Sequence, residues 1–187
     1  GAYPGLAYMK AGTMSCSFDP KEIRVALLAG DHKMNIYKSK GKVSNLEESA
    51  ASKDISGHIG IAHTRWATHG EPSTLNAHPH VSQNGRLALV HNGIIENYSN
   101  LKTFLEGKGF TFKSSTDTEV LVQLIQFIQD EYGKDLEGAV VSALRRVTGA
   151  YAIAVVDKEN PDKIVVARKS SPLVVGIGED HKEFFLA

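Results

Sequence analysis

The stretch that decides the fold is TDTEVLVQLIQFIQDEYG, residues 116–133. It opens with the S/T-x-x-E pattern of a capping box, in which Thr116 accepts a hydrogen bond from the N–H of Glu119 at the start of a helix. Apolar residues recur at helical spacing, at positions 120, 121, 124, 125 and 128, and the glycine that closes the stretch is a natural helix end. The pattern therefore predicts an amphipathic helix. Its outer, polar face should contain Gln123, Gln126 and Asp130.

Two further helices flank this one along the chain. Tyr98–Glu106 should bury Leu101, Phe104 and Leu105, and Leu136–Val147 carries an apolar stripe at the same spacing. A third, short helix is predicted over residues 45–52, while residues 1–22 show no clear period and are interpreted as loop.

Strands are predicted on both sides of the helical region. They are Ile23–Leu28, Met34–Tyr37, Ile59–Ala62, Leu87–Val90, Tyr151–Val156, Ile164–Ala167, Leu173–Ile177 and Phe184–Leu186. Turn-forming residues separate Ile23–Leu28 from Met34–Tyr37, so these two strands should form a hairpin. The same holds for Tyr151–Val156 and Ile164–Ala167. Strands, then helices, then strands again indicate an α+β domain with mainly antiparallel sheets. No composition break divides residues 1–187, which predicts a single domain with an atypical part at 1–22.

The composition is that of an ordinary globular chain and limits its partners. Twenty-one basic residues balance 21 acidic ones, which argues against a nucleic-acid binder or a protein held on an anionic membrane. No apolar run approaches the roughly 18 residues of a membrane span. The single cysteine, Cys16, excludes an internal disulfide framework and a multi-cysteine zinc site. Few cysteines and no leader fit a cytoplasmic protein.

Three polar positions could together bind an amino acid. Arg65, in the block HTRWATHG (63–70), offers a planar fork of donors for a carboxylate, although a surface ion pair would explain it equally well. Asn92 and Gly93 are either a turn or two donors that converge on one oxygen. Asp117, in the first turn of the predicted helix, either caps that helix or holds an ammonium group. In combination they describe a site for an α-amino acid with a reactive side-chain carbonyl, which is the shape of glutamine.

Histidines suggest a competing hypothesis. Positions 63, 69, 78, 80 and 91 are all histidine, which invites a metal-dependent hydrolase. Their spacing does not match a helical histidine pair, and no cysteine stands near them in the sequence. Histidine also serves as a hydrogen-bonding loop or core residue, so no metal site is predicted.

Four ordered blocks resemble those of the class II glutamine amidotransferases: HTRWATHG (63–70), NAHPH (76–80), HNGIIEN (91–97) and TDTE (116–119). The resemblance implies an Ntn-hydrolase fold, a four-layer αββα sandwich with two mainly antiparallel sheets. It also implies hydrolysis of L-glutamine to glutamate and ammonia without a cofactor.

The resemblance also assigns the site residues. Arg65 would bind the glutamine α-carboxylate, with Thr68 and His69 shaping the same loop and Trp66 helping to close it. Asn92 and Gly93 would form the oxyanion hole. Asp117 would bind the α-amino group.

The residues of the first and third blocks, 63–70 and 91–97, are most similar to the branch of the family that supplies ammonia for glucosamine 6-phosphate. That branch implies a C-terminal isomerase domain with a fructose 6-phosphate site as partner, and a homodimer when full length. The family nucleophile is an N-terminal cysteine in a Cys-Gly-Ile-Val-Gly block, whereas these 187 residues begin GAYPG and Cys16 is internal. Cys16 is therefore not assigned as nucleophile, and a glutamine-binding module without hydrolytic activity stays an alternative.

Overall fold

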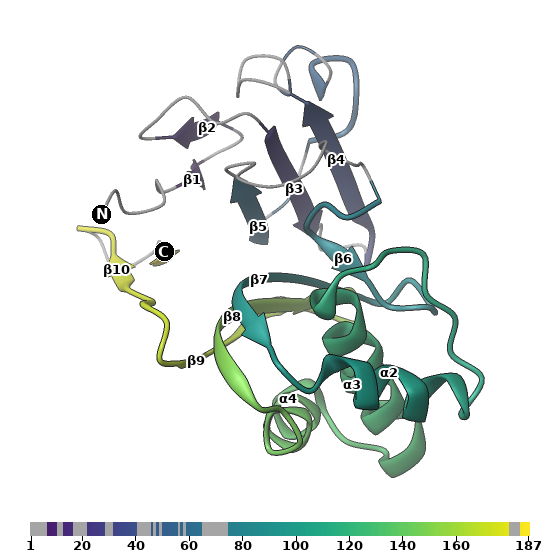
Figure 1. The fold of residues 1–187 in the computed structure, drawn as a ribbon. Helices are drawn as coiled ribbons and strands as arrows, with labels where there is room; N and C mark the ends of the chain where they lie inside the picture. The colour runs from purple at the N-terminus through teal and green to yellow at the C-terminus, as the bar shows by residue number, and fades with distance from the viewer. Residues whose placement is uncertain are drawn as a thin grey trace.

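The computed structural model describes residues 7–10, 13–16, 22–28, 32–40, 46, 48, 50–55, 57, 59–64, 75–179 and 184–187. Figure 1 shows a layer of helices packed on one sheet, and a second sheet on the opposite face of the first. None of the helices in these ranges is both long and apolar enough to cross a membrane.

A four-stranded antiparallel sheet forms the centre of the molecule. Its order is β6-β7-β8-β9, with β6 spanning His80–Val81, β7 Leu87–Ile95, β8 Gly149–Asp157 and β9 Asn160–Lys169. The β7–β8 register is continuous from one end of β7 to the other. Side chains alternate between the two faces of a strand, so every second residue of β7 points to the helices and the others point to the second sheet. The predicted pairing of the strands that became β8 and β9 is confirmed.

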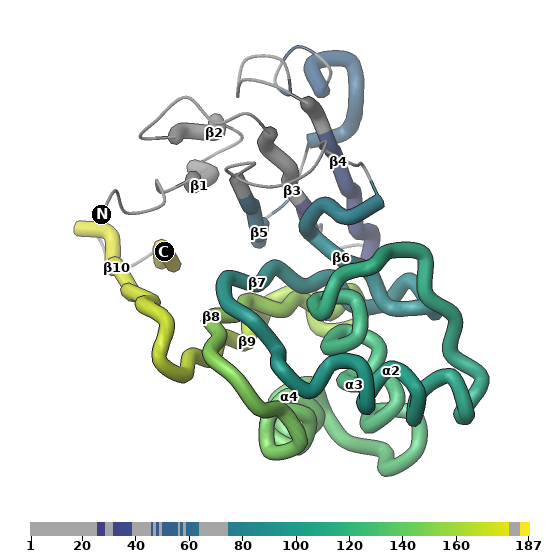
Figure 2. Tube along the Cα trace, viewed as in Figure 1, coloured from purple at the N-terminus to yellow at the C-terminus, as the bar shows by residue number. Residues whose placement is uncertain are grey.

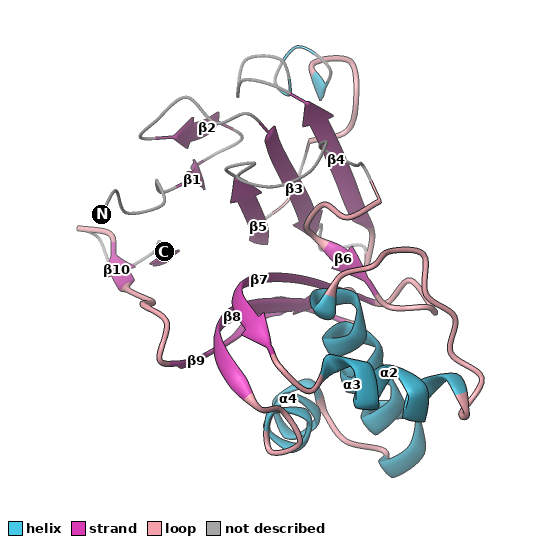
Figure 3. Cartoon of the chain, in the orientation of Figure 1, coloured by secondary structure: helices cyan, strands magenta, loops and turns pink. Residues whose placement is uncertain are grey.

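Three helices cover one face of this sheet (Figure 3): α2 (Tyr98–Glu106), α3 (Asp117–Tyr132) and α4 (Leu136–Leu144). The predicted α3 is confirmed, with Thr116 accepting from the N–H of Glu119 at 3.2 Å and Gly133 ending the helix in a left-handed conformation. The core between helices and sheet holds most of the large, fully buried side chains of the described residues. Among them are Leu87, Leu89, Ile95, Leu105, Leu121, Leu124, Ile125, Ile128 and Leu136.

Two details of the predicted helices are wrong. Gln123 and Gln126 do not form an outer face but are 2% and 6% exposed, because their side-chain oxygens accept hydrogen bonds from the N–H groups of Gln83 and Asn84 at 2.8 and 3.1 Å. The loop before β7 therefore lies over this side of α3. Phe104 of α2 is 41% exposed rather than buried.

The second sheet packs on the other face of the central sheet. It has the order β4-β3-β5, with β3 spanning Glu22–Leu28, β4 Met34–Lys40 and β5 Ile59–Thr64, and all pairs are antiparallel. The predicted β3–β4 hairpin is confirmed. The buried residues between the two sheets are Ala26, Leu28, Ile61, Ala88 and Val156. Antiparallel sheets packed face to face, with helices outside, confirm the α+β sandwich. Of the short helix predicted over 45–52, the described residues Leu46, Glu48 and Ala50 are helical.

Two hairpins complete the described structure. β1 (Ala7–Lys10) pairs with β2 (Thr13–Cys16), so part of the segment interpreted as loop forms strands. β10 (Val175–Ile177) and β11 (Phe184–Leu186) lie within two predicted strands, and they pair with each other, which was not predicted. Figure 2 shows β10 at the side of the molecule away from the helices.

Candidate active site

The Asn92-Gly93 pair lies inside a strand. β7 continues through it to Ile95, with Asn92 paired to Ala152 and Gly93 to Tyr151 of β8. The interpretation of this pair as a turn is therefore wrong, because nine consecutive residue pairs between β7 and β8 override the local turn preference of Asn-Gly. Alternation along β7 directs the Asn92 side chain to the side that faces the second sheet.

Gly93 adopts a backbone conformation that requires glycine. Its φ is 138°, and a Cβ at this position would lie 2.1 Å from the carbonyl oxygen of Ala150 on β8. Residues with a side chain avoid this region of backbone space, and no shift of a flexible side chain could relieve the contact. The sequence therefore places a backbone conformation that requires glycine at the point where the oxyanion hole was predicted.

Asp117 is joined directly to the end of the same strand. It is the first residue of α3, and its Oδ2 accepts a hydrogen bond from the N–H of Ile95 at 2.8 Å. The carboxylate thus lies at the positive end of the helix dipole, where its charge is stabilised. Because Ile95 is two residues beyond Gly93, the structure brings Asn92, Gly93 and Asp117 to one end of β7.

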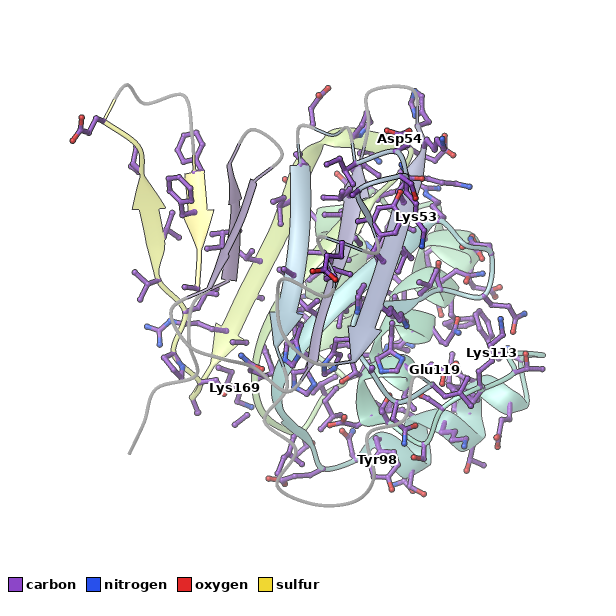
Figure 4. All side chains as sticks on the ribbon, turned by 90° about the horizontal axis from the view of Figure 1, so that it is seen from above. Lys53, Asp54, Tyr98, Lys113, Glu119 and Lys169 are labelled. Carbon is purple, nitrogen blue, oxygen red and sulfur yellow. The ribbon has the colours of Figure 1, made fainter. Side chains whose placement is uncertain are left out.

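The segment before α3 is fixed by Glu119. Its carboxylate accepts hydrogen bonds from the N–H groups of Lys113 and Ser114 at 2.9 and 2.6 Å, and from the Ser114 hydroxyl. The Glu119 carboxylate therefore fixes the residues that precede the helix. In a complete capping box it would instead accept a hydrogen bond from the N–H of Thr116. Figure 4 shows Glu119 and Lys113 close together on the helical side of the molecule. This arrangement holds the first turn of α3, and with it Asp117, in place.

A chain of histidine and threonine side chains lies behind Asn92. His63 Nε2 is 2.8 Å from Asn92 Oδ1, His78 Nδ1 is 3.3 Å from His63 Nδ1, and His78 Nε2 is 2.9 Å from Thr118 Oγ1. His91 Nδ1 lies 3.0 Å from the same hydroxyl. The roles of His63, His78 and Thr118 were not predicted. The recurrence of histidine in three of the four sequence blocks was the available signal.

Burial keeps two of the histidines neutral. Burial, helped by the charge of Lys38, lowers the pKa of His80 to about 4. Burial also lowers the pKa of His91, an effect opposed by the Asp117 carboxylate and the Ala150 carbonyl. Within the described ranges no group of three or more His, Cys, Asp or Glu side chains is placed to hold a metal ion. The imidazoles of His63, His78 and His91 contact hydroxyl, amide and imidazole groups instead.

The predicted residues Arg65, Trp66, Thr68 and His69 lie outside the described residues. Their roles stay predictions.

A cavity of about 160 Å³ lies beside Asn92, between β5, β7, β8 and β11. Its walls are mostly apolar, from residues such as Ile61, Val90 and Leu173, while His63 and Asn92 provide polar groups. The cavity therefore gives the Asn92 side chain an open space in front of it, next to the second sheet.

Two face-to-face antiparallel sheets, with an amide and a carboxylate at one strand end, define an α+β domain with polar groups gathered at the end of its central strand. The glutamine amidotransferase domain family matches residues 48–184. The chain belongs to this family of glutamine amidotransferase domains, which confirms the resemblance seen in the sequence.

Two curated relatives are glutamine–fructose-6-phosphate aminotransferases (isomerizing). That of Bacteroides thetaiotaomicron is 64% identical over 163 residues, which are 87% of this chain and 26% of that protein. That of Chlorobaculum tepidum is 56% identical over 167 residues, with the same coverage of 87% and 26%. The chain thus spans about a quarter of the length of these relatives.

Solved structures agree on the fold. Glutamine phosphoribosylpyrophosphate amidotransferase from B. subtilis, complexed with ADP and GMP, is 27% identical with a TM-score of 0.71. A structure of the allosteric regulatory enzyme of purine biosynthesis is 28% identical with a TM-score of 0.73. Each comparison covers 89% of this chain and 35% of the other.

Proposed function

We propose that this domain binds L-glutamine and hydrolyses its side-chain amide to glutamate and ammonia. The observation that supports this function is the hydrogen bond between Asp117 Oδ2 and the N–H of Ile95, which fixes a carboxylate at the strand end that carries Asn92 and Gly93. A carboxylate attracts the α-ammonium of an amino acid, and amide donors stabilise a negatively charged oxygen at its side chain.

The residues that would bind the α-carboxylate of glutamine and enclose the substrate are proposed from the resemblance to the family. In this proposal Arg65 binds the α-carboxylate with two parallel hydrogen bonds, Thr68 and His69 shape the loop around it, and Trp66 closes over the substrate. Asp117 retains acceptor capacity for the ammonium because an ionised carboxylate offers about four lone-pair positions, and the Ile95 N–H uses one.

The chemistry needs a nucleophile with its own base. In the proposed reaction the thiol of an N-terminal cysteine attacks the amide carbon, and its α-amino group takes the thiol proton. Asn92 and Gly93 stabilise the resulting oxyanion. Breaking the C–N bond releases ammonia, which carries away the proton, and water then hydrolyses the thioester to glutamate. Cys16 does not fill this role, because it is an internal residue of β2 paired with Ala7.

We extend the proposal to the full-length protein. There the ammonia would reach fructose 6-phosphate in a C-terminal isomerase domain and form glucosamine 6-phosphate. This extension is supported by the names of the relatives and by their length, of which the chain spans about a quarter. The same proposal includes a homodimer and a cytoplasmic location. It includes no cofactor, no nucleic-acid partner and no membrane partner.

The test uses full-length protein purified with its own N-terminus. It should release glutamate from glutamine, and an electrophilic glutamine analogue should modify a cysteine at that terminus, located by peptide-mapped mass spectrometry. Glutamine binding without glutamate release would overturn the hydrolytic function and favour the binding-module alternative.

Asp117→Asn tests the role of the carboxylate. The variant can still accept the Ile95 N–H but loses the charge, so the Kd for glutamine should rise about 10- to 100-fold, as expected for a lost charge-assisted hydrogen bond. Isothermal titration calorimetry measures this change. The matched control is Asp130→Asn, an exposed carboxylate near the other end of the same helix. Equal glutamine affinity in Asp117→Asn and the unsubstituted protein would contradict the assignment.

A further inference from the structure

The second sheet presents a histidine to Asn92. On β5, Ile59, Ile61 and His63 share one face, and Ile61 packs into the core between the two sheets. On β7, Ala88 and Asn92 share the face that meets it. Consequently the strand-end histidine of one sheet meets the strand-end amide of the other, and His63 Nε2 lies 2.8 Å from Asn92 Oδ1.

The direction of this hydrogen bond follows from its atoms. An amide oxygen only accepts, so His63 Nε2 carries the hydrogen. A neutral imidazole has a single N–H, which makes His63 Nδ1 an acceptor, and His78 Nδ1, 3.3 Å away, must then donate to it. His78 Nε2 is in turn an acceptor for the Thr118 hydroxyl at 2.9 Å, which is closer than Asp117 Oδ1 at 3.3 Å. Because a hydroxyl has a single hydrogen, His91 Nδ1 at 3.0 Å then donates to the Thr118 oxygen.

We propose that Thr118, His78 and His63 form a directed chain of hydrogen bonds that fixes the Asn92 side chain with its NH₂ group toward the substrate. The three are positioning residues and act through Asn92. The inference rests on the proposed glutaminase function, because it deepens the role of Asn92 in the oxyanion hole.

Orientation matters because the two ends of an asparagine amide are opposite in character. With Oδ1 held by His63, the Nδ2 hydrogens are directed away from that histidine and can donate to an oxyanion. With the amide rotated, the oxygen would face the developing negative charge and repel it. The ends have nearly the same shape, so packing alone selects poorly between them, whereas a donor at His63 Nε2 selects one.

The chain also links the two substrate-binding groups of the site. It begins at Thr118, which follows Asp117 in the first turn of α3, and ends at Asn92 on β7. One helix turn therefore sets both the carboxylate proposed for the ammonium and the amide proposed for the oxyanion. Side chains locked by such supporting hydrogen bonds are pre-organised for the transition state.

The first test is direct and does not depend on turnover. Long-range ¹H–¹⁵N NMR of the uniformly labelled protein at pH 7.5 reports which ring nitrogen of each histidine carries hydrogen. The expected result is the Nε2–H tautomer for His63 and the Nδ1–H tautomer for His78. The Nδ1–H tautomer for His63 would overturn the proposal, whether or not the protein hydrolyses glutamine.

The second test separates positioning from folding. In full-length protein, His63→Asn should lower kcat for glutamate release about 10- to 100-fold, by analogy with the loss of a hydrogen-bond partner that orients a metal-ligating side chain. KM should change little, because the oxyanion forms only in the transition state. His63→Gln should restore most of kcat, because its amide nitrogen reaches where Nε2 does.

The control is His32→Ala, which removes an exposed imidazole that contacts the Lys158 carbonyl and should leave kcat unchanged. If His63→Gln were as impaired as His63→Asn, or if KM rose in step with the fall in kcat, positioning through Asn92 would be refuted. Failure of the unsubstituted protein to release glutamate would instead refute the proposed function.

Discussion

At the scale of single residues, Gly93 places the strongest constraint on the site. In Gly93→Ala the backbone strain alone should lower the free energy of unfolding by about 1–3 kcal/mol. The total loss should exceed this range, because the new Cβ would lie 2.1 Å from the Ala150 carbonyl oxygen. The control is Gly85→Ala: that glycine also has a positive φ, 71°, but has no atom within 4 Å of a new Cβ. It should cost only the roughly 1 kcal/mol of the left-handed conformation. Urea unfolding of both variants decides the comparison; equal losses would show that the contact between the added Cβ and the Ala150 carbonyl carries no cost.

Asp157 carries a buried charge that contributes to stability. It is fully buried and receives two hydrogen bonds from Arg86, at 2.7 and 2.6 Å. Burial alone would raise the pKa of this carboxyl, but hydrogen bonds from Arg86, from the Glu159 N–H and from Asn160 outweigh it and lower the pKa below its ordinary value. A lowered folded-state pKa stabilises the protein above the unfolded pKa of about 3.9, and this stabilisation is lost as the pH falls through the folded value.

Asp157→Asn should therefore lower the free energy of unfolding by about 3 kcal/mol at pH 7, the lower end for a broken buried ion pair, because the Arg86 side chain remains 31% exposed. The deficit should shrink as the pH falls below about 4. Urea titrations across this pH range measure it. A deficit independent of pH would indicate lost packing rather than lost charge.

At the scale of elements, the N-terminus of α3 couples stability to the site. Thr116→Ala removes the cap of α3 and should cost about 1 kcal/mol, as should Asp135→Ala at the cap of α4, where Asp135 Oδ1 accepts from Gly138 at 2.8 Å. Only Thr116→Ala should also weaken glutamine binding, because α3 carries Asp117. Thermal unfolding and calorimetry on both variants test this, and matched losses of glutamine affinity would show that the cap of α3 has no special role in the site.

Local patterns predicted the elements, and contacts between distant residues limited the prediction. The helix at α3 and the hairpins β3–β4 and β8–β9 were found because capping, spacing and turns are properties of neighbouring residues. The outer face assigned to Gln123 failed because its partner, the Gln83 N–H, is 40 residues away in the chain. The Asn92-Gly93 turn failed for the same reason, since pairing with β8 cannot be read from two residues. The position of Asp117 in the first turn of α3 was predicted correctly, because it depends only on the capping pattern of neighbouring residues.

At the scale of the whole molecule, the two cores differ in the buried side chains that the structure describes. Among the described residues, the core between helices and central sheet contains nearly all the large, fully buried side chains, whereas the core between the sheets combines Leu28 and Ile61 with the small Ala26 and Ala88. Less buried apolar surface means a lower free energy of local opening. Hydrogen exchange should therefore be slowest in α3, β7 and β8 and faster in β3–β5.

This difference bears on the site, because His63 belongs to the weaker sheet and Asn92 to the stronger one. Separation of the sheets would break the 2.8 Å bond between His63 and Asn92 while leaving Asp117 attached to Ile95. Glutamine bound between the two should slow exchange selectively in β5, since a ligand stabilises the state it binds. Exchange mass spectrometry with and without glutamine measures this effect. Uniform protection of all strands, or none in β5, would mean that the second sheet takes no part in binding.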